Sequence, residues 1–253
     1  MTTALGVQLY SVREDLGPEV LADTLKRLAG MGFTHVEPYD VLGYTDALQA
    51  AMDAAGLVSR TAHANIVDPK LDRDAIVSAA KQLGIDTIIV PWVQPESIAD
   101  RAGVEALAAA INDAAEYAAP HGVRIGYHNH DFEFSQHIDG RGAYELLVEL
   151  LADNVILEVD TYWASVGGAD VFELLPRLGD RVHFLHVKTE PPNPPDRPML
   201  GVDITGRLAE VLAIAPGSVE LPIVEAVVHS GDIFPVLERN AEFFLTTLSR
   251  ERA

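Results

Sequence analysis

Residues 154–160 read Asn-Val-Ile-Leu-Glu-Val-Asp, a short apolar run that ends at a carboxylate and leads into a helical stretch. The same order of apolar run, run end and helical stretch recurs eight times along the chain. The eight run ends are Gln8, Glu37, His63, Trp92, the His128–His130 pair, Asp160, His186 with Lys188, and Glu225. All of them except Trp92 are polar or ionisable. Strand alternating with helix predicts an α/β protein with a parallel sheet, because parallel neighbours require crossover connections.

The eight expected strands are Leu5–Leu9, Phe33–Glu37, Leu57–His63, Thr87–Trp92, Val123–His128, Asn154–Asp160, Val182–Lys188 and Val219–Glu225. Helices are expected between residues 18 and 30 and over Asp46–Ala55, Asp72–Leu83, Val104–Ala118, 141–152, 169–178, 205–214 and 232–249, with Asp72 as an N-cap. Eight such units in 253 residues indicate one (β/α)8 TIM barrel domain over residues 1–253, since this fold typically takes about 250 residues. The alternative, a doubly wound sheet, favours a Gly-rich turn after the first strand, which this chain lacks.

The chain carries 18 Lys and Arg against 38 Asp and Glu, a formal net charge of −20. Such a surface repels phosphate backbones and anionic membranes, so neither nucleic acid nor a membrane is an expected partner. No apolar run reaches the roughly 18 residues of a membrane helix, and no signal peptide is visible. The absence of cysteine excludes disulfides and thiolate metal sites, and a cytoplasmic location is expected.

Side chains alternate between the faces of a strand, so residues two apart share a direction. Alternation places Glu158 and Asp160 on one face of their strand, and it aligns His186 with Lys188 on the next strand. In a closed parallel barrel the strand ends converge on one rim, where active sites of this fold lie. Asp160, His186 and Glu225 end three successive strands, and all three are metal-ligand types.

A carboxylate that ends an apolar strand cannot stay unpaired inside a barrel, because burying a bare charge is strongly unfavourable. A divalent cation among Asp160, His186 and Glu225 would resolve this. The set of oxygen and imidazole ligands suits Mn²⁺, Co²⁺, Mg²⁺ or Zn²⁺. The alternative is that Asp160 and Glu225 form structural salt bridges with Lys188, Arg13 or Arg124.

Residues 191–198 read Pro-Pro-Asn-Pro-Pro-Asp-Arg-Pro. The prolines forbid a helix or a central strand, so a stiff loop is expected after the seventh strand. In a barrel this loop lies on the catalytic rim, where it serves either as a lid or as a spacer.

Four stretches have a familiar form: residues 6–13 (Gly-Val-Gln-Leu-Tyr-Ser-Val-Arg), 127–134 (Tyr-His-Asn-His-Asp-Phe-Glu-Phe), 158–163 (Glu-Val-Asp-Thr-Tyr-Trp) and 186–188 (His-Val-Lys). Together with Val224-Glu225 and Gly231-Asp232, they resemble the sugar phosphate isomerase/epimerase proteins of the xylose isomerase-like TIM barrel superfamily. The resemblance covers essentially the whole chain. It implies the barrel fold and a bound metal more firmly than it implies a substrate.

Members of that superfamily typically bind one divalent cation through a Glu after strand five, an Asp after six, a His after seven and a Glu after eight. The resemblance assigns the last three places to Asp160, His186 and Glu225. Position on the fifth strand points to His128 for the remaining place, whereas the nearest glutamate is Glu133 in the following loop. Glu133 is slightly preferred, because three carboxylates suit a hard divalent ion. The implied cofactor is one divalent metal ion, Mn, Co, Mg or Zn.

The resemblance implies a metal-dependent isomerase or epimerase of a sugar or keto-sugar, acting through an enediolate. The cation would polarise a carbonyl so that the adjacent C–H becomes acidic, and Glu133 or Glu225 would remove that proton. His128, His130 or Lys188 would donate protons. Expected substrate-binding residues are Gln8, Glu37, His63, Trp92, His130 and Trp163, with the two tryptophans forming apolar walls.

Three other functions stay open. A lyase or dehydratase of a keto-inositol or 3-keto-glycoside would keep the enolate and expel a β-substituent. A non-catalytic sugar-binding barrel is suggested by Thr189, where relatives commonly carry Asp, and by Ala226, Val227 and Val228, where many carry polar residues. An endonuclease for abasic DNA is opposed by the charge of −20. The expected partner is a small-molecule sugar, and the assembly is left open between a monomer and a homodimer.

Overall fold

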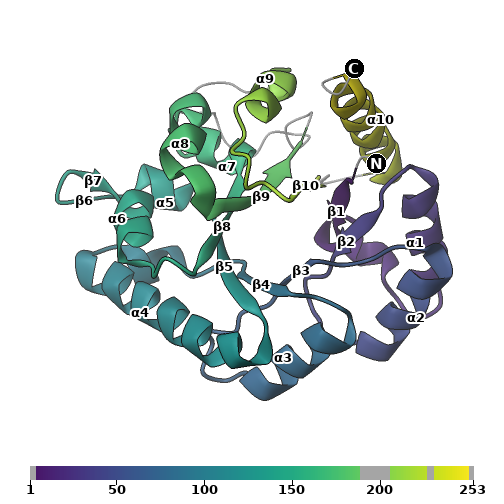
Figure 1. Ribbon diagram of the computed structural model, residues 1–253, viewed down its shortest axis with the longest axis horizontal. Helices are drawn as coiled ribbons and strands as arrows, with labels where there is room; N and C mark the ends of the chain where they lie inside the picture. Colours follow the sequence, from purple (N-terminus) through teal and green to yellow (C-terminus); the bar gives the residue numbers. More distant parts are fainter. Residues whose placement is uncertain (1–3, 189–205, 227–230, 251–253) are drawn as a thin grey trace.

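The computed structural model describes residues 4–188, 206–226 and 231–250. Eight parallel strands form one sheet in the order β2-β1-β10-β9-β8-β5-β4-β3. They are β1 (Gly6–Gln8), β2 (His35–Glu37), β3 (Thr61–His63), β4 (Thr87–Val90), β5 (Arg124–His128), β8 (Ile156–Asp160), β9 (Val182–Val187) and β10 (Leu221–Val224). The two ends of this order meet where Val36 N donates to Val58 O, which precedes β3 (2.9 Å). The predicted strands thus form a nearly closed barrel, surrounded by helices (Figure 1).

The α-helices are α1 (Leu21–Gly30), α2 (Thr45–Ala55), α3 (Arg73–Gln82), α4 (Arg101–Ala118), α5 (Phe132–Ser135), α6 (Ala143–Leu150), α7 (Thr161–Val166), α8 (Val171–Leu178), α9 (Leu208–Ala213) and α10 (Phe234–Arg250). The 3-10 turns are η1 (Leu9–Asp15), η2 (Pro95–Ile98), η3 (Ala119–His121) and η4 (Gly179–Arg181). The expected helices are found, and Asp72 caps α3 as predicted by accepting from Asp74 N and Ala75 N. Within the described residues, no helix has the length and apolar character that a membrane span requires.

Sequence patterns did not predict α5, α7 or the antiparallel hairpin of β6 (His137–Ile138) and β7 (Arg141–Gly142). These elements are too short to show a hydrophobic period. The helix α5 and the β6–β7 hairpin lie between β5 and α6 and next to α6, whereas α7 directly follows β8 and lies next to α8 (Figure 1). The short helix α5 determines where Glu133 lies.

The barrel interior changes from apolar to polar along its axis. Near the amino ends of the strands, the interior holds a small cluster of Ile89, Ile156, Phe184, Leu221 and Ile223. Gly126 makes room for this cluster, because a Cβ there would lie 2.5 Å from Ile89 Cδ1 and 2.9 Å from Ile156 Cγ1. Two residues further along several strands, the buried side chains are polar: Gln8, Glu37, His63, His128, Glu158 and His186. The apolar filling therefore ends where these polar groups begin.

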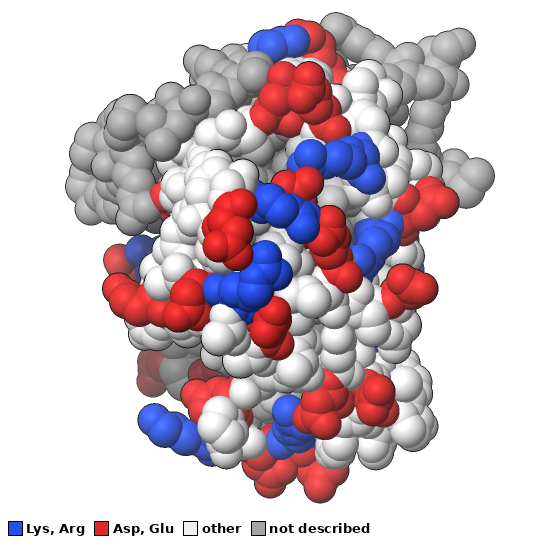
Figure 2. Space-filling view, turned by 90° about the vertical axis from the view of Figure 1, so that its left-hand side faces the viewer, with Lys and Arg blue, Asp and Glu red and all other residues white. Residues whose placement is uncertain are grey.

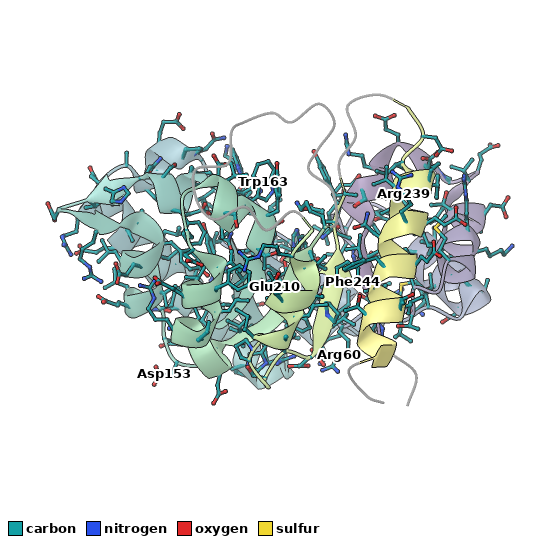
Figure 3. The ribbon with its side chains drawn as sticks, turned by 90° about the horizontal axis from the view of Figure 1, so that it is seen from above. Arg60, Asp153, Trp163, Glu210, Arg239 and Phe244 are labelled. Carbon is teal, nitrogen blue, oxygen red and sulfur yellow. The ribbon has the colours of Figure 1, made fainter. Side chains whose placement is uncertain are left out.

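Ion pairs tie the amino ends of the strands together. Glu220 accepts from Arg60 (2.7 Å) and from Arg124 (2.6 Å), and Asp86 lies 3.0 Å from each of the two arginines. His183 Nδ1 lies 2.8 Å from Glu220 Oε1. We call these five residues the amino-end network. In Figure 3, Arg60 and Trp163 mark the opposite ends of the barrel.

The outer face with the β6–β7 hairpin and α6 shows acidic and basic side chains interspersed rather than gathered by sign (Figure 2). Ion pairs of this region include Arg101 with Asp139 (3.1 Å) and Arg141 with Glu145 (3.9 Å). These side chains are substantially exposed, so each pair contributes little to stability.

Candidate active site

A pocket of about 410 Å³ opens at the carboxyl ends of the strands. Its size falls within the range of small-molecule sites, roughly 300–1,000 Å³. Five of its lining residues were predicted from the sequence: His63, Trp92, His128, His130 and Glu225. Among the described residues, Tyr10, Tyr39 and Pro91 also line it.

The two tyrosines of the pocket were missed, although the sequence carried a signal. Tyr10 and Tyr39 each come two residues after a polar strand end, Gln8 and Glu37, in the segments where residues of this rim are expected. Their rings meet edge to face with centroids 5.3 Å apart. Tyr10 and Trp92 are 42% and 40% exposed, so the mouth of the pocket offers aromatic surface on which the C–H face of a sugar can pack.

Beneath the pocket lie two fully buried carboxylates, Glu37 and Glu158, which we call the deep pair. Glu158 Oε1 lies 2.7 Å from His63 Nε2, 3.0 Å from His128 Nδ1 and 3.1 Å from His186 Nε2. Glu37 Oε2 lies 2.7 Å from His186 Nε2 and accepts from Gln8 Nε2 at 2.8 Å. Three imidazoles from three strands therefore converge on the deep pair.

The deep pair and its histidines perturb one another electrostatically. Burial raises the pKa of Glu158 to about 7, and the neighbouring charge of Glu37 adds to the rise. Burial also acts to raise the pKa of Glu37, but His63 and His186 outweigh it and hold that pKa well below its usual range. Burial lowers the pKa of His186, yet Glu158 and Glu37 overcome this and the net pKa is well above its ordinary value. Such opposed shifts within one cluster are typical of functional sites.

Closer to the rim, Asp160, Lys188 and Glu225 form a second charged group. Lys188 Nζ lies 3.1 Å from Asp160 Oδ2 and 3.7 Å from Glu225 Oε2. Asp160 Oδ1 also caps α7 by accepting from Trp163 N at 2.8 Å. The predicted salt-bridge alternative is therefore found for Lys188. It is not found for Arg124, which belongs to the amino-end network.

The donor set fits a divalent cation. His128, Asp160, His186 and Glu225 each offer a ligand atom, and these four atoms lie within 4.8 Å of one another. A second set, His63, His128, Glu158 and His186, meets the same limit. His186 Nδ1, Glu37 Oε1 and Glu158 Oε2 are buried without a hydrogen-bond partner among the described residues. Buried polar atoms without partners are unfavourable. A cation that accepts a lone pair from one of these three atoms would give that atom a partner.

Glu133 is not part of either set. It lies in α5 and is fully buried, and its carboxylate accepts from Tyr127 Oη (2.8 Å) and from the backbone N of His130 (2.9 Å). Burial raises the pKa of Glu133 to about 7. The slight preference for Glu133 over His128 as strand-five ligand therefore gains no support from the geometry, because His128 and not Glu133 offers a ligand atom within 4.8 Å of those of Asp160, His186 and Glu225.

Several other predicted residues lie beside or beneath the pocket rather than on its wall. Gln8 and Glu37 have at most 1% exposure and bond to each other beneath the pocket. Trp163 packs beside His130, with ring centroids 6.1 Å apart, and Lys188 Nζ lies 5.3 Å from the centre of its indole ring. The Pro-rich loop 191–198, Thr189, Val227 and Val228 lie outside the described residues. Ala226 is buried, and its backbone N donates to Ser11 Oγ (3.0 Å).

Solved structures share this architecture. A sugar phosphate isomerase/epimerase from Parabacteroides distasonis is 20% identical, with a TM-score of 0.75 over 97% of this chain and 94% of that one. A xylose isomerase-like TIM barrel protein from Mycobacterium smegmatis in complex with magnesium is 15% identical, with a TM-score of 0.68 over 100% and 98% of the two chains. The probable 3-DHS dehydratase AsbF from Bacillus anthracis is 13% identical, with a TM-score of 0.69 over 96% and 98%. At these identities the likeness is one of fold.

A search of curated proteins found no match to the chain. The sequence profile of one family, described as xylose isomerase-like TIM barrel, matches residues 25–239. That span includes the strand ends from Glu37 to Glu225, and with them most of the pocket and both candidate ligand sets. The chain belongs to the xylose isomerase-like TIM barrel family.

Proposed function

We propose that this protein is a divalent-metal-dependent isomerase or epimerase of a sugar or keto-sugar, and that His128, Asp160, His186 and Glu225 hold the ion. The observation that carries the proposal is the convergence of these four side chains, two of which, His128 and Glu225, line a pocket with aromatic walls. A divalent ion bound there would supply Lewis acidity, which makes the C–H beside a substrate carbonyl easier to deprotonate. Mn²⁺, Co²⁺, Mg²⁺ and Zn²⁺ all accept such a ligand set.

Glu225 is the proposed base. It is the carboxylate among the described residues that line the pocket. Burial acts to raise the pKa of Glu225, but His186 and Lys188 outweigh it and hold the pKa below its ordinary value, so the carboxylate is in the deprotonated form that a base requires. Transfer of that proton to the other carbon of an enediolate isomerises the sugar, whereas delivery of a proton from the opposite face to the original carbon epimerises it.

His130 is the proposed second proton carrier, on the wall of the same pocket. Burial lowers the pKa of His130 to about 4, so the ring is neutral near pH 7, with one N–H to donate and one bare nitrogen to accept. His63 and the aromatic rings of Tyr10, Tyr39 and Trp92 would orient the sugar. Lys188 neutralises Asp160 and Glu225 rather than facing the pocket.

The test combines metal analysis with proton exchange. Purified protein should carry or bind one divalent ion, and a panel of keto-sugars should include one that exchanges a C–H proton with D₂O. Asp160→Asn should abolish the exchange, whereas Asp170→Asn should not. The two variants are matched, because both aspartates cap a helix and asparagine is an equally good N-cap.

The masses of the products separate the candidate reactions. Isomerisation and epimerisation conserve mass, whereas a dehydratase or lyase releases water or an alcohol. Exchange accompanied by such a loss would replace the isomerase with a lyase on the same residues. Sugar binding without exchange, unchanged in Asp160→Asn, would leave a non-catalytic sugar-binding barrel. Besides the ion, the proposed partner is a small sugar, and neither nucleic acid nor a membrane is a proposed partner. The proposed location is the cytoplasm, and the assembly is a monomer or a homodimer.

A further inference from the structure

Glu158 makes an unusual set of contacts for one carboxylate. A single oxygen, Oε1, lies within 3.1 Å of imidazole nitrogens from His63, His128 and His186. Its residue has no exposed surface, so water does not compete for these contacts. A carboxylate oxygen is an acceptor. When Glu158 is ionised, the ring nitrogens that approach Oε1 are therefore the donors.

These contacts decide which ring nitrogen of each histidine remains free. His128 directs Nδ1 to Glu158, which leaves Nε2 as its other ligand atom. His186 directs Nε2 to both Glu158 and Glu37, which leaves Nδ1. His186 Nδ1 is buried without a hydrogen-bond partner among the described residues, and it lies 3.6 Å from Glu225 Oε2. The free nitrogen of His186 thus faces a carboxylate of the rim group.

Glu37 is itself anchored to the first strand. Gln8 Nε2 donates to Glu37 Oε2 at 2.8 Å, while Gln8 Oε1 accepts from the backbone N of Tyr10 at 3.0 Å. The amide of Gln8 is thereby held in one orientation, with its NH₂ toward Glu37. A short relay therefore runs from the η1 backbone at Tyr10 through Gln8 and Glu37 to the Nε2 side of His186.

We propose that Glu37 and Glu158 are positioning residues that hold His128 and His186 in the tautomers presenting Nε2 and Nδ1, respectively, to the ion. The inference rests on the proposed function and deepens it. Histidines that ligate a metal usually donate their other ring N–H to a carboxylate or carbonyl, and loss of that partner typically weakens metal binding by about 10–100-fold. Here one pair of carboxylates serves two ligands at once.

Metal affinity tests the proposal without any substrate. Mn²⁺ is titrated into the metal-free wild-type protein, Glu158→Gln and Glu37→Gln, followed by calorimetry. Each variant should bind Mn²⁺ roughly 10–100-fold more weakly, with one site per chain retained. Glu220→Gln is the matched control, because Glu220 also accepts from an imidazole, His183 Nδ1, at the opposite end of the barrel. Its Mn²⁺ affinity should equal that of the wild type.

A spectroscopic readout is independent of how well the variants fold. In wild-type protein loaded with diamagnetic Zn²⁺, ¹⁵N-histidine NMR should show protonated Nδ1 in His128 and protonated Nε2 in His186. Zinc bound through the opposite nitrogens would overturn the proposal. A merely structural role for the deep pair would not determine which nitrogen carries the proton.

The remaining outcomes separate this inference from the proposed function. Wild-type protein that binds no Mn²⁺ or Zn²⁺ would contradict both. Normal binding in the wild type with unchanged affinity in both variants would overturn the positioning role alone. Two ions per chain, with one lost in Glu158→Gln, would also overturn it, because the second set of His63, His128, Glu158 and His186 would then hold a cation itself.

Discussion

Two glutamates flank β10, and they differ in how completely they are paired. Glu220, before the strand, has Arg124, Arg60 and His183 within 2.6, 2.7 and 2.8 Å. Glu225 follows the strand, and its Oε2 lies 3.6 Å from His186 Nδ1 and 3.7 Å from Lys188 Nζ. Glu225 is 9% exposed. One end of the strand presents a satisfied carboxylate, and the other presents one that is still able to take a ligand or a proton.

The same contrast holds for the two ends of the barrel. The amino-end network balances two arginines with two carboxylates, all of them partly exposed. The carboxyl end buries Glu37, Glu158, Asp160 and Glu225, which among the described residues contact Lys188, His63 and His186. Charge that is paired at the surface adds a little stability, whereas a dense cluster of buried charge is tolerated where function requires it. Whether a carboxylate at a strand end is structural or functional therefore depends less on the number of charges nearby than on whether it is fully paired.

The largest expected effect is on turnover, from removing the unsatisfied glutamate. Glu225→Gln should lower proton exchange in the responsive keto-sugar by about 10²–10⁴-fold, the usual contribution of a general base. The fold should persist, because Glu225 and Asp160 repel each other and their repulsion contributes to the raised pKa of Asp160. The measurement is the rate of D₂O exchange. Glu220→Gln, at the other end of β10, is the control. Equal losses of exchange rate in the two variants would contradict the proposed difference between Glu220 and Glu225.

The next effect is on stability at the carboxyl end. Lys188→Met should lower the free energy of unfolding by about 3–5 kcal/mol in metal-free protein, because it leaves Asp160 and Glu225 without their cation. Urea unfolding measures the loss. Added Mn²⁺ should recover much of it, since an ion that binds only the folded state stabilises that state. A loss that Mn²⁺ does not recover would show that the lysine site and the ion site are unrelated.

A smaller change is expected at the amino end. Glu220→Gln should lower the free energy of unfolding by about 1 kcal/mol, because the pairs that it breaks are partly exposed and screened. The same urea titration measures it, without metal and with saturating Mn²⁺. The loss should be identical in both conditions. Dependence on Mn²⁺ would mean that the two ends of the barrel are coupled.

The smallest effect is the pH dependence of that loss. Burial raises the pKa of Glu220, but hydrogen bonds from Arg124 and His183 outweigh it, and the pKa lies below its ordinary value of 4.5. A depressed pKa contributes stability that is present above the unfolded-state value and disappears as the pH falls through the folded-state value. The difference between wild type and Glu220→Gln should therefore shrink between pH 7 and pH 3. A difference that grows on acidification would place the pKa shift in the opposite direction.

Local sequence signals predicted the barrel and most of the rim, because both depend on short-range periodicity. The alternation of apolar runs and helices identified all eight strands. The period of two within a strand placed Glu158 on the same face as Asp160 and aligned His186 with Lys188. The short elements α5, α7 and β6–β7 gave no periodic signal. Glu133, carried by α5, was consequently assigned to the rim on the basis of a resemblance.

Contacts between distant strands could not be predicted in the same way. Glu37 and His186 are separated by 149 positions in sequence and 2.7 Å in space. Nothing in the local sequence around either residue specifies that pair. Alternation placed Glu158 on the same strand face as Asp160, but its contact with three imidazoles depends on the stagger of β3, β5, β8 and β9.

Strand periodicity and hydrophobic patterning depend on residues that are close in the sequence. The amino-acid sequence therefore indicated that polar and ionisable residues end the strands of a parallel barrel. Only the tertiary structure decided which of them meet: His128 rather than Glu133 joins Asp160, His186 and Glu225, and Glu37 with Glu158 lies beneath them. Closure of the barrel sets the distances between side chains that are far apart in the sequence. Hydrogen bonding and charge pairing depend on those distances to within a fraction of an ångström.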